Sequence, residues 1–214
     1  MAEVIITEKP DSVTYQEISR VLREAHREHI RNGIVMRVPS LPPEELEKWV
    51  GPDGKCFVAM DGEQVVGTAS YKVRAFRRWY CRGNAAELTM DGVLPEWQGK
   101  HILTMLNRAR EEAILRMGFR VLYLDTAEEN IRRLKIAEKE GFIPVDYLFP
   151  NSRSKGKYFV CMVKWADHSP FPRWYCRFRF QLKKLFVKAV YTVLGNSFHK
   201  VAGRIHRRSG EKKG

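Results

Sequence analysis

The last part of the chain has almost no acidic residues. Residues 168–214 contain twelve lysines and arginines but a single carboxylate, Glu211, which gives this segment a net charge of +11. The whole chain carries +13, so +2 remains for residues 1–167. We therefore expect a nearly neutral domain over residues 1–167, followed by a strongly basic extension over residues 168–214.

Three further features are missing. No stretch has the eighteen or so apolar residues that would span a bilayer. The first ten residues contain Glu3 and Glu8 and no long apolar run, which is unlike a secretory signal. The four cysteines lack C-x-x-C spacing, which argues against a zinc site and favours reduced thiols. We predict a cytoplasmic protein without a metal.

Hydrophobic patterning predicts a mixed α/β fold. Capping-box patterns at Thr14-x-x-Glu17 and Thr126-x-x-Glu129 each predict the start of a helix, and Asp61-Gly62 predicts a hairpin turn. The arginine-rich segment 74–82 is expected to form a loop. The expected strands cover residues 4–7, 56–60, 65–71, 85–94, 121–124, 145–149 and 158–165, and the expected helices cover residues 14–33, 43–50, 102–117 and 126–141.

The most informative segment is the sequence from Val93 to Lys100, which leads into the apolar-periodic stretch beginning at Ile102. A strand reaches Pro95, turns through Gln-Gly-Lys and starts a helix. The first N–H groups of a helix lack intrahelical acceptors and lie at the positive end of the helix dipole. This turn is therefore suited to binding a phosphate.

The strand before the turn contains Asp91-Gly92 near its end. A glycine inside a strand pattern suggests a β-bulge, at which a sheet can open and a ligand can approach the backbone. The free backbone groups could then pair with an extended ligand, as an added strand does.

The order of elements and two motifs resemble the GNAT acyltransferase superfamily over roughly residues 3–166. The first motif is the turn from Val93 to Lys100, which is similar to that family's pyrophosphate turn. The second extends from Asn130 to Gly141-Phe142. The resemblance implies a GNAT-like fold and transfer of an acyl group, expected to be acetyl, from acetyl-CoA to an amine.

The resemblance also implies a set of cofactor-binding residues. They are Val93, Leu94, Gln98, Gly99, Lys100, His101, Ile102, Leu103 and Asn130. The chain departs from the family pattern at three places. His101 and Leu103 stand where glycines are usual, and Ala137 stands where a tyrosine often serves as general acid.

Attack on a thioester needs a neutral amine, so a base must take the proton of the acceptor directly or through water. Glu87 is the first candidate, because it lies eleven residues before Gln98, the spacing of the catalytic glutamate in some members of the superfamily. Asp91 is the alternative, and it shares the strand face of Glu87 if the bulge lies beyond it. Glu87 could equally be a salt-bridge partner.

A second function remains open at this point. The chain could be a catalytically weak or inactive GNAT-like module that binds CoA or a partner and is localised by its basic extension. The acceptor amine is not specified by the sequence.

Within the extension, apolar residues from Leu182 to Leu194 follow helical spacing, and Lys183, Lys184 and Lys188 fall outside that stripe. This pattern predicts an amphipathic helix. Residues 173–208 could bind an anionic membrane surface, which would place the protein at the inner face of the membrane. Nucleic acid or a ribosome is a weaker alternative, and the stripe could instead pack on the body or on a second copy of the chain.

Overall fold

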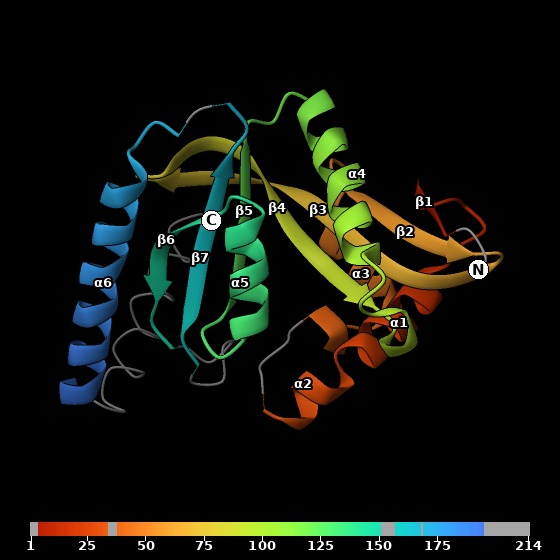
Figure 1. Cartoon of the computed structure of the whole chain (residues 1–214), viewed down its shortest axis with the longest axis horizontal. Helices are drawn as coiled ribbons and strands as arrows, with labels where there is room; N and C mark the ends of the chain where they lie inside the picture. Colours follow the sequence, from red (N-terminus) through yellow and green to blue (C-terminus); the bar gives the residue numbers. More distant parts are fainter. Residues whose placement is uncertain (1–3, 34–37, 151–156, 168, 195–214) are drawn as a thin grey trace, which may run out of the picture. The chain divides into compact units, whose positions relative to one another are not determined.

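The computed structural model describes residues 4–33, 38–150, 157–167 and 169–194. The chain forms two compact units: residues 1–124 with 165–168, and residues 125–164 with 169–214. Over the described ranges, seven strands follow the hydrogen-bonded order β1-β2-β3-β4-β5-β7-β6, and six α-helices accompany them (Figure 1). The predicted mixed α/β fold is confirmed.

The first unit contains a ladder of antiparallel strands that ends in a parallel pair. Its strands are β1 (Ile5–Glu8), β2 (Lys55–Asp61), β3 (Gln64–Arg78), β4 (Cys81–Val93) and the first part of β5 (Val121–Ala127). Its helices are α1 (Tyr15–Ala25), α2 (Arg27–Arg31), α3 (Pro43–Val50) and α4 (Ile102–Arg116).

Helices cover both faces of this sheet. At Gly92 on β4, an added Cβ would lie 3.2 Å from the Cβ of Ala25 on α1. At Gly67 on β3, it would lie 3.1 Å from a methyl group of Leu106 on α4. Because Gly67 pairs with the neighbour of Gly92 and side chains alternate along strands, the two helices lie on opposite faces. Both glycines permit close contact between helix and sheet.

The prediction of a loop at residues 74–82 is wrong. Strand β3 continues to Arg78 and β4 begins at Cys81, so Trp79 and Tyr80 form a two-residue turn in a long hairpin. The arginines suggested a loop because they are charged, but they lie on the exposed end of a two-stranded ribbon, where polar side chains remain in water.

Two helix predictions also need correction. The expected helix over residues 14–33 is interrupted at His26, which separates α1 from α2, although the capping box of Thr14 and Glu17 is present. The expected cap at Thr126 is absent because Thr126 belongs to β5. Instead, Asn130 caps α5 (Ile131–Lys139), and its side-chain oxygen accepts a hydrogen bond from the N–H of Arg133.

The second unit contains α5, β6 (Ile143–Leu148), β7 (Phe159–Trp165) and α6 (Arg173–Leu194). Helix α6 packs against β6 through a row of buried side chains formed by Cys176, Phe180 and Val187. No helix in the described ranges is long and apolar enough to cross a membrane.

Candidate active site

A β-bulge interrupts β4 where the sequence placed it. Thr89 pairs with Ser70 and Gly92 pairs with Thr68, so Met90 and Asp91 together oppose one residue of β3. Met90 has a φ of 58°, in the left-handed region that bulky residues rarely adopt. The predicted irregularity near Asp91-Gly92 is confirmed.

Arg110 of α4 binds the backbone at this bulge. Its side chain is 1% exposed, and its guanidinium donates to the carbonyl oxygen of Ser70 at 2.8 Å and to that of Thr89 at 3.3 Å. It also binds the carboxylate of Asp91 at 2.5 Å. One side chain therefore fixes both strands at the point where the ladder is interrupted.

On its other edge, β4 has a short pairing with β5. The two strands pair in parallel only at Ala86 with Leu122 and at Glu87 with Tyr123 within the part of the chain that the structure describes. Residues 88–93 of β4 therefore extend beyond the part of the strand that pairs with β5. This is the opening that a bulged strand was expected to provide for an extended, amide-bearing ligand.

The turn after β4 leads directly into α4. Residues Pro95–Trp97 form a short 3-10 helix, Gly99 has a φ of 80°, and α4 starts at Ile102. The side-chain amide of Gln98 donates to the carbonyl oxygen of Val93 at 3.2 Å, which ties the turn to the strand. The ammonium of Lys100 lies 4.2 Å from the centre of the Trp97 ring.

The start of α4 has no side-chain cap, in contrast to α1 and α5, which are capped by Thr14 and Asn130. Helix geometry leaves the N–H groups of its first residues without intrahelical acceptors. At α4 these donors stand at an exposed turn that contains Gly99, Lys100 and His101. The arrangement leaves them available to an anion.

His101 occupies the first of the two positions at which the family pattern has glycine. Its φ is 61°, so the backbone retains the left-handed conformation that glycine adopts without steric cost. Histidine in place of glycine therefore changes the side chain but preserves the backbone conformation of the turn. The imidazole is exposed.

The remaining candidate cofactor-binding residues differ in which of their groups are accessible to a ligand. Val93, Leu94 and Ile102 have buried side chains, so only their backbone groups could meet a ligand. Leu103 is partly exposed. Asn130 belongs to the second unit, where its side-chain oxygen already caps α5.

Glu87 is 7% exposed and lies between two cations. Its carboxylate is 3.3 Å from the ammonium of Lys72 and 2.9 Å from the guanidinium of Arg74. Trp49 of α3 completes the cluster, because its indole N–H donates to the hydroxyl of Thr89 at 3.0 Å and the Lys72 ammonium lies 3.5 Å from its ring centre. Glu87 is thus both a salt-bridge partner and a buried carboxylate beside the opening of the sheet.

Asp91 does not share the setting of Glu87. The bulge lies at Met90 and Asp91 rather than beyond Asp91, so the alternation that would place Glu87, Thr89 and Asp91 on one face is broken. The carboxylate of Asp91 binds Arg110 of α4, whereas Thr89 faces Trp49 of α3.

His26 connects the break between α1 and α2 to the bulge. Its Nε2 lies 2.6 Å from the carbonyl oxygen of Asp91. Burial lowers the pKa of His26 most strongly, and the neighbouring His29 lowers it further, while the hydrogen bond to Asp91 opposes both. A neutral imidazole that donates to this carbonyl is consistent with that direction.

The sequence did not reveal Lys72, Arg74, Trp49 or Arg110 as neighbours of the candidate carboxylates. The sequence could have indicated Lys72 and Arg74. If Trp79 and Tyr80 are taken as the two-residue turn of a hairpin, the antiparallel register pairs Lys72 with Glu87. No local pattern indicates Trp49 or Arg110, because each reaches β4 from a helix distant in the sequence.

The family pattern would place a tyrosine, as general acid, at Ala137. Ala137 is fully buried in α5. In the same unit, the Tyr147 hydroxyl donates to Glu128 at 2.5 Å, and burial together with this hydrogen bond strongly raises the pKa of Tyr147. A phenol with a raised pKa is a poorer acid.

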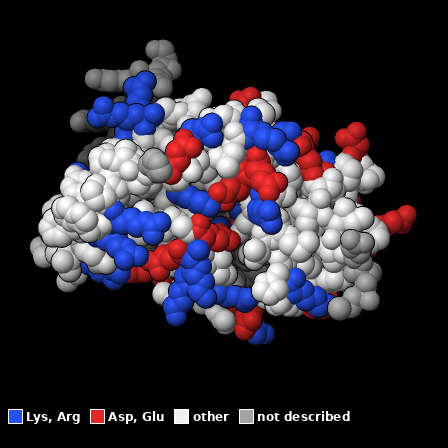
Figure 2. All heavy atoms as spheres, turned by 45° about the horizontal axis from the view of Figure 1, so that its top comes forward, with Lys and Arg blue, Asp and Glu red and all other residues white. Residues whose placement is uncertain are grey.

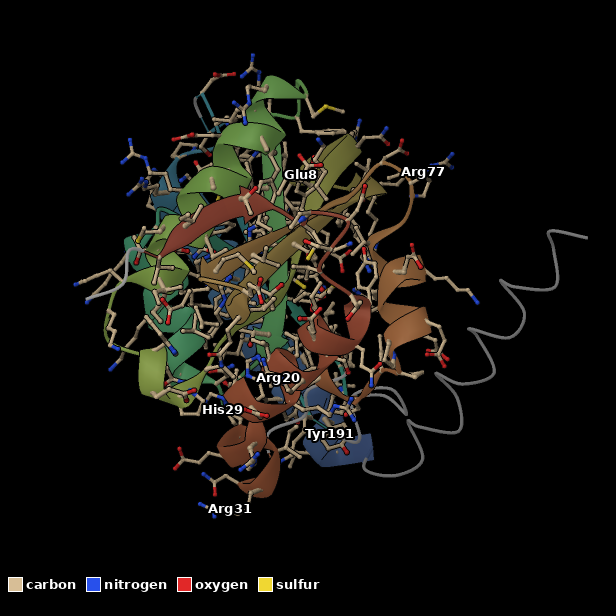
Figure 3. The ribbon with its side chains drawn as sticks, turned by 90° about the vertical axis from the view of Figure 1, so that its right-hand side faces the viewer. Glu8, Arg20, His29, Arg31, Arg77 and Tyr191 are labelled. Atoms are coloured by element: carbon tan, nitrogen blue, oxygen red, sulfur yellow. The ribbon has the colours of Figure 1, made fainter. Side chains whose placement is uncertain are left out.

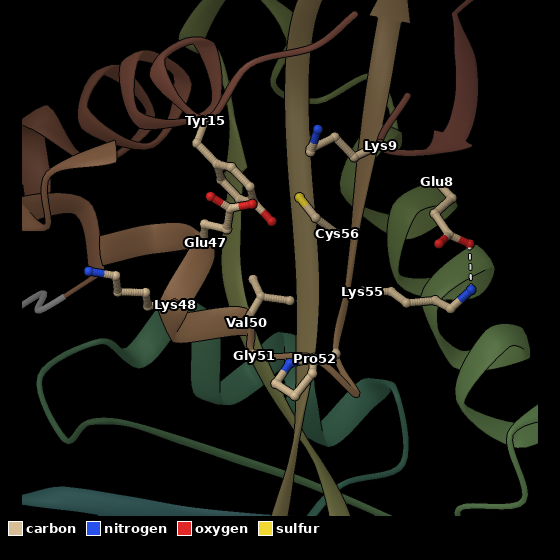
Figure 4. A pocket seen from close by; sticks show the side chains of 11 residues that line it. Glu8, Lys9, Tyr15, Glu47, Lys48, Val50, Gly51, Pro52, Lys55 and Cys56 are labelled. Atoms are coloured by element: carbon tan, nitrogen blue, oxygen red, sulfur yellow. Dashed lines mark hydrogen bonds and ion pairs between the residues drawn. The ribbon is translucent and has the colours of Figure 1, made fainter. Parts of the chain in front are cut away.

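A separate hollow of about 610 Å³ lies between α1, α3 and the start of β2 (Figure 4). Tyr15, Glu47 and Cys56 line it, and Lys55 at its rim binds Glu8 at 2.8 Å. None of the candidate cofactor or catalytic residues lines this hollow. Among the described residues, no group of three or more metal-ligating side chains is placed to hold a metal ion.

Comparison with known proteins gives a family match. The model of the Acetyltransferase (GNAT) family matches residues 18–142, more than half of the chain. This range contains the bulge, the turn and Glu87. None of the curated protein sequences matches the chain.

Solved structures share the fold at low sequence identity. A GNAT-family acetyltransferase from Desulfovibrio desulfuricans, described as putative, is 14% identical, with a TM-score of 0.61 over 77% of this chain and 99% of that one. An aminoglycoside 6'-N-acetyltransferase complexed with coenzyme A is 20% identical, with a TM-score of 0.56 over 78% and 99%. An Escherichia coli N-acetyltransferase named for an alanine of a ribosomal protein is 13% identical, with a TM-score of 0.57 over 78% and 96%.

Proposed function

The chain belongs to the GNAT acetyltransferase family, and we propose that it transfers an acetyl group from acetyl-CoA to an amine, with Glu87 as the base. The observation that carries the proposal is the uncapped start of α4 directly after a bulged strand. This pair of features supports binding of a ligand that has both a diphosphate and an amide-rich arm.

The cofactor contacts that we propose are mostly backbone contacts. The N–H groups at the start of α4 and in the turn at Gly99 would bind the diphosphate, which carries the charge that the helix dipole favours. The edge of β4 beyond Glu87, where pairing with β5 has ended, would pair with the amide groups of the pantetheine arm. His101 and Leu103 permit these contacts because a backbone donor does not depend on its side chain.

The proposed base acts on the acceptor amine. Glu87 lies where β4 leaves β5, so it would take the amine proton directly or through one water as the nitrogen attacks the thioester carbonyl. The C–S bond breaks, the acetyl group moves to nitrogen, and the CoA thiolate takes up a proton. Lys72 and Arg74 hold the carboxylate in place and compete with the amine for it.

Calorimetry with acetyl-CoA, combined with release of the CoA thiol in the presence of a panel of amines, tests both parts. We expect wild type to bind acetyl-CoA and Gln98→Ala to bind it more weakly, because Gln98 ties the turn to β4. We expect Glu87→Gln to keep the affinity and to lose about 10²- to 10⁴-fold in kcat.

Glu63→Gln is the control, since Glu63 is an exposed carboxylate in the turn between β2 and β3, outside the candidate site. It should leave both binding and turnover unchanged. No binding by wild type would overturn the enzymatic proposal. Normal turnover by Glu87→Gln would overturn the assignment of the base alone.

A further inference from the structure

Helix α6 has an apolar face that is exposed among the residues that the structure describes. Six of the eleven large apolar side chains that are exposed among the described residues belong to this one helix. In Figure 2, atoms without charge predominate along the left margin, the side on which α6 lies in Figure 1. We call these six residues the outer stripe: Trp174, Phe178, Leu182, Leu185, Phe186 and Val193.

The outer stripe lies opposite the face that packs. At 100° per residue its members fall within one third of the helix circumference, and the buried residues Cys176, Phe180 and Val187 fall on the other side. The apolar stripe from Leu182 to Leu194 that the sequence predicted is therefore not the face of α6 that packs on β6. Its exposure is high, reaching 67% at Leu185 and 82% at Val193.

The three lysines of α6 form ion pairs with two carboxylates of the second unit. Lys184 and Lys188 lie 2.6 Å and 3.2 Å from the Glu128 carboxylate, and Lys183 binds Asp146. These ion pairs join the helix to the rest of the second unit and help to keep its apolar stripe exposed. The sequence pattern placed these lysines off the stripe correctly but did not show that they form ion pairs.

Three arginines of α6 lie near the outer stripe. Arg173 and Arg177 are exposed, and no ion pair is found for either among the described residues. Arg179 is exposed at the opposite border of the stripe, where it donates to the hydroxyl of Tyr175. The sequence that follows α6, residues 195–214, adds six lysines and arginines against Glu211 alone.

We propose that the outer stripe binds an anionic phospholipid surface, with α6 lying in the plane of the interface. Aromatic and aliphatic side chains would enter the boundary between headgroups and acyl chains, and the flanking arginines would meet lipid phosphates. A nucleic acid would satisfy the arginines but not the aliphatic residues. A second α6 would satisfy the stripe but would bring together two segments that have no carboxylate before Glu211.

Flotation of the full chain with phosphatidylcholine vesicles, with and without phosphatidylglycerol, tests this proposal. We expect binding only to the anionic vesicles, and a loss of affinity of more than about tenfold in the double variant Leu182→Ser/Leu185→Ser. The control is Met117→Ser/Ile131→Ser, which removes two similarly exposed apolar side chains outside α6 and should bind as wild type does.

A second pair of variants tests the charge. Arg177→Gln should weaken binding about fivefold, with a loss that shrinks at high salt. Arg31→Gln, at the exposed end of α2, removes the same charge elsewhere and should have no effect (Figure 3). Thermal unfolding of each variant verifies that it is folded, which is expected because all substituted side chains are exposed.

Three results would overturn the proposal. They are equal binding to neutral and anionic vesicles, wild-type affinity in the Leu182→Ser/Leu185→Ser variant, and a dimer of the full chain that this variant converts to monomers. Vesicle binding does not depend on acetyl-CoA, so its failure is distinguishable from failure of the proposed enzymatic function.

Discussion

The buried guanidinium of Arg110 binds the carboxylate of Asp91 at 2.5 Å and thereby joins the middle of α4 to the bulge of β4. The same helix presents its uncapped N-terminus to the turn. One helix therefore contacts both the bulged strand and the turn at Gly99, and the Arg110–Asp91 pair fixes their relative position.

The Arg110–Asp91 pair should be essential for stability. Asp91→Asn leaves a buried guanidinium without its anion, and we expect a loss of about 3–5 kcal/mol in the free energy of unfolding. Arg110→Met/Asp91→Asn should be less destabilised than Asp91→Asn alone, because no buried charge is left unpaired. Urea unfolding of wild type, Asp91→Asn, Arg110→Met and the double variant measures this, and additive losses of the two single variants would contradict the coupling.

The left-handed backbone at His101 predicts a stabilising substitution. His101→Gly should raise the free energy of unfolding by about 0.5–1 kcal/mol, since glycine adopts positive φ without the steric cost that histidine bears. Lys100→Gly is the control, because Lys100 has a negative φ and glycine there should destabilise the turn. Calorimetry should show acetyl-CoA affinity at least equal to that of wild type in His101→Gly. A lower affinity would mean that the imidazole itself contacts the ligand.

Removal of one cation from Glu87 should separate its structural role from its chemical role. Lys72→Met loses the ion pair with Glu87 and the contact with Trp49, but it retains Arg74 beside the carboxylate. We expect kcat to stay within about tenfold of wild type, a change of about 1.4 kcal/mol, because Arg74 still binds the carboxylate. Steady-state kinetics measures this. A loss as large as that in Glu87→Gln would show that the carboxylate acts mainly by positioning.

The ion pairs beneath α6 should make stability depend on pH. Burial raises the pKa of Glu128, but hydrogen bonds from Lys184, Tyr147 and Lys188 outweigh it and lower the pKa below the ordinary 4.5. A carboxyl with a lowered pKa in the folded state stabilises the protein above its unfolded pKa, and this contribution is lost as the pH falls through the folded pKa. The melting temperature should therefore fall below about pH 4.5, with a smaller fall in Glu128→Gln. Glu129→Gln is the control, and it should retain the wild-type profile.

The sequence predicted most strands and helices because their periodicity and boundary signals are local. The hairpin of β2 and β3, the capping box at Thr14 and the glycine that ends α4 all depend on nearby residues alone. The hairpin turns at Gly62 and Glu63, one residue later than expected, because Asp61 pairs with Gln64. The bulge near Asp91-Gly92 and the turn at Gln98 belong to the same class. The predictions failed where charge was taken as a sign of a loop, at residues 74–82, and where two capping signals compete, at Thr126 and Asn130.

The same five residues, Arg-Trp-Tyr-Cys-Arg, occur twice with different structures. At residues 78–82 they form the turn between β3 and β4, and at residues 173–177 they form the first turns of α6. Tyr80 and Cys81 are buried at the first site, whereas at the second only Cys176 is. Identical local propensities yield a hairpin or a helix according to what each segment packs against.

The sequence alone thus determined the order of the elements, the family, the turn that leads into α4 and the amphipathic character of α6, since each depends on neighbours within one or two turns of chain. Only the tertiary structure decided that Asp91 pairs with Arg110, that Glu87 lies between Lys72 and Arg74, and that the lysines of α6 face the body. These outcomes depend on contacts between residues far apart in the chain. Burial of each charge requires a partner of opposite sign, and no local pattern identifies that partner.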